Sequence, residues 1–240
     1  VHGFTSPIGV ILPSLAYYIS GSDLAAIWIF RTLFAIPAFV GAVYMLFRAS
    51  EKIFNQYPVV IYLCPLFLVL DVKSVMFSVN GMETAFMLFF SAWMLKVAVC
   101  ENWDWRKLGS CWGGLMWTRP DSCVYIAAFI ISSLFFMPHS RKSQVRIFIK
   151  SALLCALLYL PWFIFAWLYY GSPVPHTITA KRAGLLLAIS DHSIIQEFLS
   201  VLFSFVRIPT FIFYPVYPQF QYWPRLVFFF AAFLGCFAIF

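Results

Sequence analysis

The sequence predicts an all-α protein, a polytopic bundle of about six to eight transmembrane helices with one further short helix outside the membrane. Three observations predict this class: the composition, the length of the apolar runs and the distribution of charge. Apolar residues make up 63% of the 240 residues, aromatic residues 21% and charged residues only 10%. An average soluble domain is about half apolar and one quarter charged, so a soluble fold of this composition would lack polar groups to cover its surface.

The apolar runs define the predicted helices, because a bilayer core of about 30 Å needs about 20 helical residues. Residues 25–47 and 147–170 reach this length. Residues 7–19 are too short to span the core and contain two prolines, so we expect an interfacial or re-entrant helix there. The remaining predicted segments are shorter or less apolar: 58–70, 84–99, 105–117, 122–137 and 194–214.

The net charge of +7 comes from basic residues that alternate between rich and poor turns, a pattern typical of membrane topology rather than of nucleic-acid binding. The rich turns are expected in the cytoplasm, which sends residues 71–83, 118–121 and 171–184 to the outer face. The rich turns contain Arg48, Lys52, Lys96, Arg106, Lys107, Arg141, Lys142, Arg146 and Lys150, and the poor turns contain Lys73, Arg119, Lys181 and Arg182.

The first outer turn ends with Asn-Gly-Met-Glu-Thr at residues 80–84, before an apolar helix. Glu83 in the first turn suits the positive end of the helix dipole, and this capping role is one interpretation. The other is that the carboxylate, beside a flexible glycine, orients a hydroxyl group or a cation. Both roles place Glu83 at the outer face.

The second outer turn, Thr-Arg-Pro-Asp at residues 118–121, is predicted as the tip of a helical hairpin, since Pro120 stops one helix and suits the start of the next. Both arms are too short to cross the core, so the tip is expected below the outer surface. Charged side chains and irregular backbone at that depth need protein or water beside them. We therefore favour a polar cavity lined by Arg119 and Asp121 over a local ion pair that only neutralises itself.

The third outer turn, residues 170–177, alternates Gly and Pro and is predicted as a rigid extended loop. Within it, His176 and Thr177, together with Lys181 just beyond, are candidate contacts for an anionic substrate, the alternative being a merely solvated histidine. Arg31 lies about 9 Å inside the outer end of its predicted helix, where it either snorkels to the surface or faces the same cavity.

These residues together suit an anionic, sugar-bearing substrate. Basic groups at headgroup level suit a phosphate, and carboxylates suit sugar hydroxyls and proton transfer. Aromatic residues near the outer face are candidates for stacking on a sugar, or belong to an ordinary interfacial belt: Trp112, Trp117, Tyr169 and Tyr170. Nucleotide, zinc-protease and serine-hydrolase motifs are absent. The six cysteines lie in or beside apolar runs without metal-site spacing and are interpreted as buried apolar residues.

Four motifs occur in an order that resembles glycosyltransferases of the GT-C superfamily, of the mycobacterial terminal arabinofuranosyltransferase type. They are His-Gly-Phe-Thr-Ser-Pro at 2–7, the turn at 80–84, the Thr-Arg-Pro-Asp hairpin, and Tyr-Gly-Ser-Pro-Val-Pro-His-Thr at 170–177 with Ala-Lys at 180–181. The resemblance implies an integral membrane enzyme in the cell membrane. It would transfer sugar from a polyprenyl-phosphate donor to a glycan, lipid or protein acceptor at the extracytoplasmic face.

The resemblance also implies roles for single residues. Glu83 matches the second acidic position of the family and Asp121 the acid of the hairpin, whereas His176 stands where relatives often have Asn. Arg119, with Lys181 or Arg31, would stabilise the leaving phosphate.

The family's principal catalytic Asp lies upstream of the Gly-Phe-Thr-Ser-Pro segment. In this numbering it would precede Val1, the first residue of the chain. We therefore interpret the chain as a fragment that lacks this residue and is inactive alone. A divalent cation is left open, and no metal site is predicted.

The domain organisation expected is one GT-C-like domain over residues 1–240. Residues 1–22 would be the juxtamembrane part of the first outer loop, 25–170 the core spans, 171–184 an outer loop and 185–240 further spans, where 185–205 either spans or lies flat. Two other classes stay open: a transporter or flippase of a lipid-linked substrate, and a non-catalytic membrane scaffold. An internal inverted repeat would favour the transporter, and none is evident.

Overall fold

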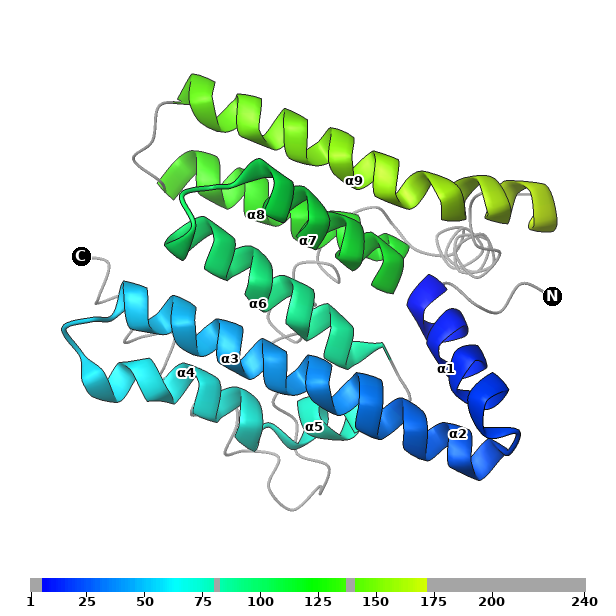
Figure 1. Ribbon diagram of the computed structural model, residues 1–240. Helices are drawn as coiled ribbons and strands as arrows, with labels where there is room; N and C mark the ends of the chain where they lie inside the picture. The colour runs from blue at the N-terminus through cyan, green and yellow to red at the C-terminus, as the bar shows by residue number, and fades with distance from the viewer. Residues whose placement is uncertain (1–5, 80–82, 137–140, 172–240) are drawn as a thin grey trace, which may run out of the picture. The chain divides into compact units, whose positions relative to one another are not determined.

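The structure, a computed structural model, describes residues 6–79, 83–136 and 141–171 (Figure 1). All regular secondary structure within these ranges is helical. The elements in chain order are α1 (Pro7–Ser20), α2 (Asp23–Ile29), a π-helical segment (Phe30–Ala35), α3 (Ile36–Ile53), α4 (Pro58–Leu70), α5 (Val72–Val79), α6 (Thr84–Cys100), α7 (Trp105–Thr118), a 3₁₀ turn (Pro120–Ser122), α8 (Cys123–Phe136) and α9 (Arg141–Tyr170).

Two of the described helices are long and apolar enough to cross a membrane, Asp23–Ile53 and Ser143–Tyr169. They contain the predicted span 25–47 and all but the last residue of 147–170, and the helical class is confirmed for the described ranges. A third crossing is formed if α4 and α5, which meet at a bend of 53°, count as one broken span. The structure thus describes a helical protein with two or three candidate membrane spans.

The short first helix forms where the sequence predicts it. Pro7 occupies the first helical turn, where its missing N–H costs nothing, and Ser6 Oγ accepts a hydrogen bond of 2.9 Å from Gly9 N. The helix ends at Gly21, whose φ of 65° is the left-handed conformation that glycine adopts without strain. With 14 residues, α1 is about 21 Å long, less than the bilayer core. It packs on α2 and reaches α7.

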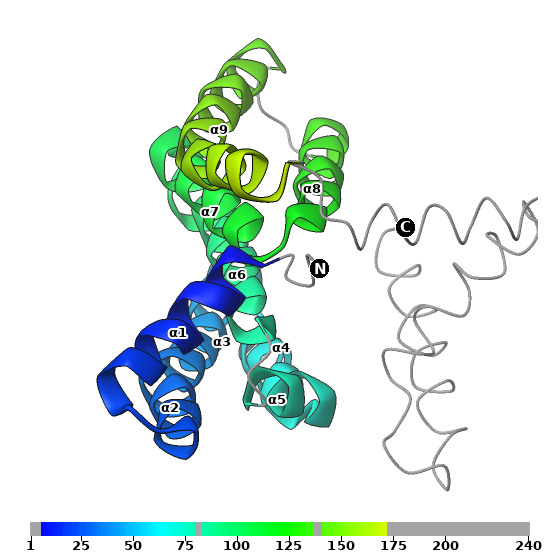
Figure 2. The same ribbon diagram turned by 90° about the vertical axis from the view of Figure 1, so that its right-hand side faces the viewer.

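Four helices form a row of neighbours, because α3 packs on α6, α6 on α7 and α7 on α9 (Figure 1; Figure 2). Glycines on α7 allow this close approach. A Cβ atom on Gly109 would lie 2.9 Å from Ser151 O of α9, and one on Gly113 would lie 2.8 Å from the Leu158 side chain. Gly114 faces the other neighbour, where a Cβ would lie 2.2 Å from the Phe90 ring of α6. Small residues four apart are a common device for packing helices in membranes.

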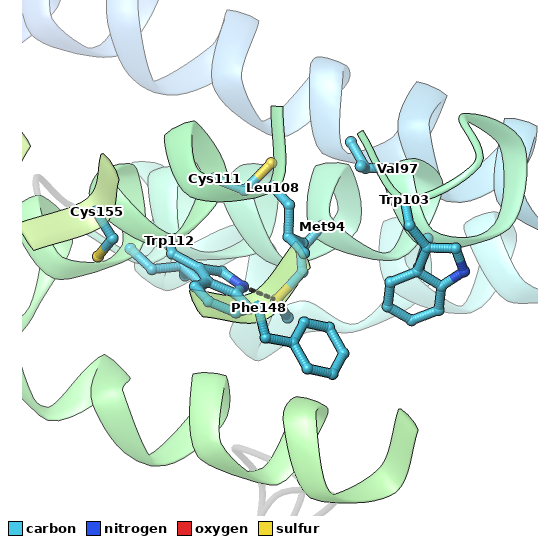
Figure 3. Close-up of a cluster of buried hydrophobic side chains, with 10 residues drawn as sticks. Met94, Val97, Trp103, Leu108, Cys111, Trp112, Phe148 and Cys155 are labelled. Carbon is cyan, nitrogen blue, oxygen red and sulfur yellow. Dashed lines mark hydrogen bonds between the residues drawn. The ribbon is translucent and has the colours of Figure 1, made fainter. Parts of the chain in front are cut away.

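The core between α6, α7 and α9 contains Trp112, which corrects one expectation from the sequence. Its side chain is only 1% exposed, and its Nε1 donates a hydrogen bond of 3.3 Å to Met94 Sδ (Figure 3). The ring also packs against Phe148 of α9. Trp112 is therefore a core residue, and the hypothesis that it stacks on a sugar is wrong.

The helix ends group in the way the alternating turns predict. At one end, Cys100 Sγ donates to Arg48 O at 3.5 Å, and Ser151 Oγ donates to Trp105 O at 3.1 Å. The first contact joins the last turns of α3 and α6, and the second joins the start of α7 to the first part of α9. The turns rich in basic residues adjoin these helix ends, and we call this end of the bundle the basic end. The opposite ends of α6 and α7 carry Glu83 and Arg119, and we call that the carboxylate end.

Two features depart from the predicted helices. The first is the π-helical segment inside the long predicted helix over 25–47. Pro37 lacks an N–H and its ring clashes with the carbonyl four residues before it, and Ile36 N instead bonds Arg31 O, five residues back. The second is α5, which occupies most of the predicted outer turn 71–83. It starts where Ser74 N donates to Asp71 Oδ2 at 2.9 Å.

The five described cysteines are all free thiols, and their burial differs. Cys111 and Cys155 are buried as expected, while Cys123 is exposed, so the interpretation as buried residues is wrong there. The predicted segments 185–205 and 194–214, the loop 171–184 beyond its first residue, and the first five residues lie outside the described ranges.

Candidate functional site

The candidate site stands at the carboxylate end, where three charged residues come from two separate turns. Glu83 immediately precedes α6, and its side chain makes no capping hydrogen bond. The carboxylate thus forms no cap hydrogen bond, but its N-cap position lies at the positive end of the α6 dipole, and that interpretation stays a prediction. Arg119 follows α7 in an extended conformation, and Asp121 lies in the 3₁₀ turn that Pro120 begins.

The geometry of the three side chains centres on Arg119. Its Nε donates to Asp121 Oδ1 at 3.1 Å and lies 3.8 Å from Glu83 Oε1. The Arg119 side chain is 41% exposed, Glu83 is 20% exposed and Asp121 is 56% exposed. The hairpin is thus more than a local pair, because the same guanidinium faces a carboxylate from another helix.

Neither Nη group of Arg119 forms a hydrogen bond within the part of the chain that the structure describes. An arginine whose Nε is held by a carboxylate can still donate to an anion through its Nη groups, and phosphate is an anion that suits such a fork. The arrangement can therefore hold a phosphate against Arg119 while two carboxylates lie beside it.

The first turn of α1 forms another wall of the site, which the sequence analysis did not anticipate. A Cβ atom on Gly9 would lie 3.7 Å from Glu83 Oε2, which is an ordinary contact distance, so the carboxylate lies beside the first turn of α1. The signal available in the sequence was the Ser-Pro start of α1. That start identifies a helix N-terminus but not the residue it approaches.

Two serine side chains near these turns are buried away from the surface. Ser122 follows Asp121 in the chain, and its Oγ has no hydrogen-bond partner among the described residues. The same holds for Ser78, which precedes Val79 at the end of α5.

Arg31 lies in the π-helical segment and contacts the end of α5 and a ring of its own helix. Its Nε donates to Val79 O at 2.8 Å, and its guanidinium carbon lies 5.9 Å from the centroid of the Trp28 ring. It forms no ion pair with a carboxylate in the described ranges. Arg31 thus anchors α5 to the first long helix rather than pairing with Glu83 or Asp121.

An apolar groove of about 540 Å³ opens between α1, α7 and α9, and its wall reaches the last turn of α7. Trp117, two residues before Arg119, donates from Nε1 to Leu158 O at 2.8 Å. That carbonyl lies beside Pro161, which interrupts the hydrogen bonds of α9. The groove is lined by Val10, Ile11, Trp117, Pro161, Trp162, Phe165 and Tyr169.

The remaining predicted site residues have no described position. His176, Thr177 and Lys181 lie beyond residue 171. Val1, before which the resemblance places the principal catalytic Asp, is among the first five residues and also lies outside the described ranges. The structure therefore tests neither the contacts expected from the third outer turn nor the position of that Asp, and both stay predictions.

Of the aromatic residues predicted near the outer face, those other than Trp112 include two with a described side chain and one without. Trp117 and Tyr169 line the groove, and nothing is described of the Tyr170 side chain. In the described ranges no group of three or more His, Cys, Asp or Glu side chains gathers as metal ligands. Among the described residues, Trp117 brings the aromatic groove closest to Arg119 in the chain.

Within the described ranges, the fold and the site define a helical protein with two or three candidate membrane spans and a carboxylate–guanidinium cluster beside an aromatic groove. Comparison with protein-family models, with curated proteins and with solved structures finds no match to the chain.

Proposed function

We propose that the chain belongs to an integral membrane glycosyltransferase that transfers a sugar from a polyprenyl-phosphate donor to a glycan, lipid or protein acceptor. One observation carries the proposal: Arg119 lies between two carboxylates, at the end of a helix whose preceding turn lines an apolar groove. A polyprenyl-phosphate sugar has an apolar chain, an anionic phosphate and a polar sugar. The groove, Arg119 and the carboxylates match these three parts in kind.

In the proposed reaction an acceptor hydroxyl oxygen attacks the anomeric carbon of the donor sugar. The bond from that carbon to the phosphate oxygen breaks, its electron pair leaves with the polyprenyl phosphate, and a carboxylate takes the hydroxyl proton. Arg119 stabilises the negative charge that develops on the phosphate, which is electrostatic catalysis by a fixed positive group. The sugar is transferred with inversion at the anomeric carbon.

The roles of the carboxylates follow from their positions. Glu83, less exposed and fixed near α1, orients the sugar or acceptor hydroxyls, and Asp121 holds the Arg119 guanidinium through its Nε. The resemblance assigns the base to an Asp at a position before Val1. His176, Thr177, Lys181 and a divalent cation remain further candidates for contacts with the phosphate.

The proposed setting is a GT-C-like bundle of about six to eight spans in the cell membrane. The basic end faces the cytoplasm, in keeping with the positive-inside rule, and the carboxylate end faces outside. The short α1, which lies beside Glu83, then corresponds to a juxtamembrane helix of the outer face. Residues 1–240 would form part of this single domain.

The test is a transfer assay on the protein as the cell makes it, reconstituted with a panel of polyprenyl-phosphate sugars. Release of polyprenyl phosphate and appearance of glycosylated acceptor are measured together. Arg119→Ala is expected to lower turnover at least a hundredfold, because removal of a donor to developing charge typically costs that much. Arg48→Ala, a change of the same kind at the basic end, is the matched control and is expected to retain wild-type turnover.

Two results would contradict the proposal. Wild-type turnover in Arg119→Ala would remove the role of Arg119. Movement of the intact donor between leaflets without release of polyprenyl phosphate would instead identify a flippase of a lipid-linked substrate.

A further inference from the structure

The basic end carries an exposed group of cations around one indole ring, which the proposed function does not use. Trp105 is the first residue of α7 and packs beside α9 through the hydrogen bond of its carbonyl from Ser151. The Arg106 guanidinium carbon lies 5.5 Å from the centroid of its ring, and Lys150 Nζ lies 5.8 Å from the same centroid. Two like charges thus share one aromatic ring, each stabilised by its quadrupole.

Neither of these cations is neutralised by an ion pair within the described ranges. The acids at this end are engaged elsewhere. Glu101 binds Lys96 and Lys107, each at 2.6 Å, and Glu51 binds Arg48 at 2.8 Å. Asp104 caps α7 by accepting a hydrogen bond of 3.0 Å from the backbone N–H of Arg106. The Arg106 guanidinium itself forms no salt bridge within the described ranges.

The surroundings add further positive charge. Lys52 ends α3 and Arg146 lies on the first part of α9, both exposed. Lys52 lies in the last turn of one candidate span, and Arg146 and Lys150 lie in the first ten residues of α9, before most of its apolar residues. Basic residues at the ends of spans favour the level of lipid headgroups. Tryptophan is also the residue that favours this level.

We propose that Trp105, Arg106 and Lys150 form a binding site for the phosphate of an anionic phospholipid at the membrane surface. Arg106 and Lys150 supply charge-assisted hydrogen bonds to the phosphate, and the indole ring fixes their spacing while it packs on the glycerol region. The site lies at the opposite end of α7 from Arg119 and does not depend on the function proposed above.

The experiment measures binding of spin-labelled phosphatidylglycerol to the reconstituted full chain, relative to spin-labelled phosphatidylcholine, as the fraction of motionally restricted label. A basic residue near an anionic membrane contributes about 1 kcal/mol, about a fivefold change in association constant. The double variant Arg106→Gln/Lys150→Gln is therefore expected to lower the relative association constant at least tenfold. Trp105→Leu, which retains both cations, is expected to lower it less.

The matched control removes the same charge from the same end on α3, which packs on α4 and α6 rather than beside Lys150. Arg48→Gln/Lys52→Gln is expected to change the relative association constant by less than threefold, since diffuse attraction falls off within about 10 Å. An equal loss in both double variants would overturn the site, because it would show only the overall charge of this end. No loss in the first variant would overturn it as well.

Two further arms close the remaining alternatives. Sodium phosphate competes for the same two cations and should weaken lipid binding more than sodium chloride at equal ionic strength. Tighter binding of inorganic phosphate than of phosphatidylglycerol would identify a site for a soluble anion and overturn the lipid assignment. If the double variant does not elute as a folded species, Lys150→Gln alone, at an exposed position, provides the test, with an expected loss of about fivefold.

Discussion

Arg119 Nε lies 3.8 Å from Glu83 Oε1, although the two residues belong to different turns. Glu83 immediately precedes α6, and Arg119 immediately follows α7. The contact is longer than a hydrogen bond and both side chains are partly exposed, so it contributes little to folding. The same relationship is what a site for a phosphate and a sugar needs. Stability and activity should therefore respond differently when this pair is changed.

We predict that Glu83→Gln leaves the free energy of unfolding within about 1 kcal/mol of wild type but lowers sugar transfer at least tenfold. The amide retains the shape of the side chain and loses the negative charge that orients hydroxyl groups. Denaturant unfolding in detergent and turnover in proteoliposomes measure the two quantities. The control is Glu51→Gln at the basic end, whose ion pair with Arg48 is likewise partly exposed. Full transfer activity in Glu83→Gln would exclude this role of the carboxylate.

Trp117→Phe removes the hydrogen bond from Nε1 to Leu158 O and retains an aromatic ring in the groove. A lost hydrogen bond of this kind costs about 1 kcal/mol, so thermal unfolding should start a few degrees lower. Trp167→Phe serves as the comparison, because Trp167 is an exposed residue on the same helix α9 as Leu158. If both variants unfold at the same temperature, the Leu158 carbonyl is satisfied in another way.

Gly109→Ala tests the close packing of α7 on α9. The added methyl group would lie 2.9 Å from both the backbone oxygen of Ser151 and the Leu154 side chain, so the helices must separate. Overpacking of this kind costs about 1–3 kcal/mol, read as a lower free energy of unfolding. Ser110→Ala, one residue further along α7, removes only a hydrogen bond within its own helix and should be close to neutral. Equal stability of the two variants would show that α9 moves without cost.

The Glu101 carboxylate predicts a pH dependence. Partial burial raises its pKa, but hydrogen bonds and charges from Lys107 and Lys96 outweigh that effect and hold the pKa below the usual value of 4.5. Because the folded-state pKa is the lower one, this stabilisation is present above pH 4.5 and is lost as the pH falls through the folded-state value. Glu101→Gln should therefore unfold a few degrees lower at pH 7 and match wild type in strong acid.

The comparison for that prediction is Glu51→Gln, which breaks a pair of more exposed residues. Its effect at pH 7 should be smaller. Unfolding curves of Glu101→Gln that differ from wild type by the same amount at every pH would mean that the carboxylate acts through shape rather than charge.

Helix boundaries were largely predictable from the sequence because strong local signals mark them. Proline is the first residue of α1 and of α4, and Pro120 lies in the turn after α7. The structure therefore places the ends of these helices within two residues of the prediction. The proximity of Glu83 to Arg119 also followed from the sequence, since alternation of basic turns sends both to one end of the bundle. Their shared end of the bundle was predictable because α6 and α7 run in opposite directions, so the start of one helix lies at the same end as the finish of the other.

The faces of the helices were not predictable in the same way. In a helix that is apolar on all sides, the face toward lipid and the face toward protein have the same kind of residues, so no periodic pattern distinguishes them. The sequence therefore does not separate the buried Trp112 from the groove residue Trp117. The approach of Gly9 to Glu83 depends on how α1 crosses α6 and α7, which local patterns do not encode. The sequence did not predict α5, because the polar residues at the start of 71–83 favoured a turn over that whole range.

The π-helical segment Phe30–Ala35 has a consequence for how this chain tolerates changes in length. A π turn accommodates one residue more than the α-helical turn it replaces, and each residue corresponds to a rotation of about 100°. Deleting a single residue there would leave the packing of α3 on α6 in place and swing everything before it around the helix axis. Arg31 would then lose Val79, and the two helices at the start of the chain would present new sides to the bilayer. This short stretch sets the rotational phase between the first part of the chain and the rest.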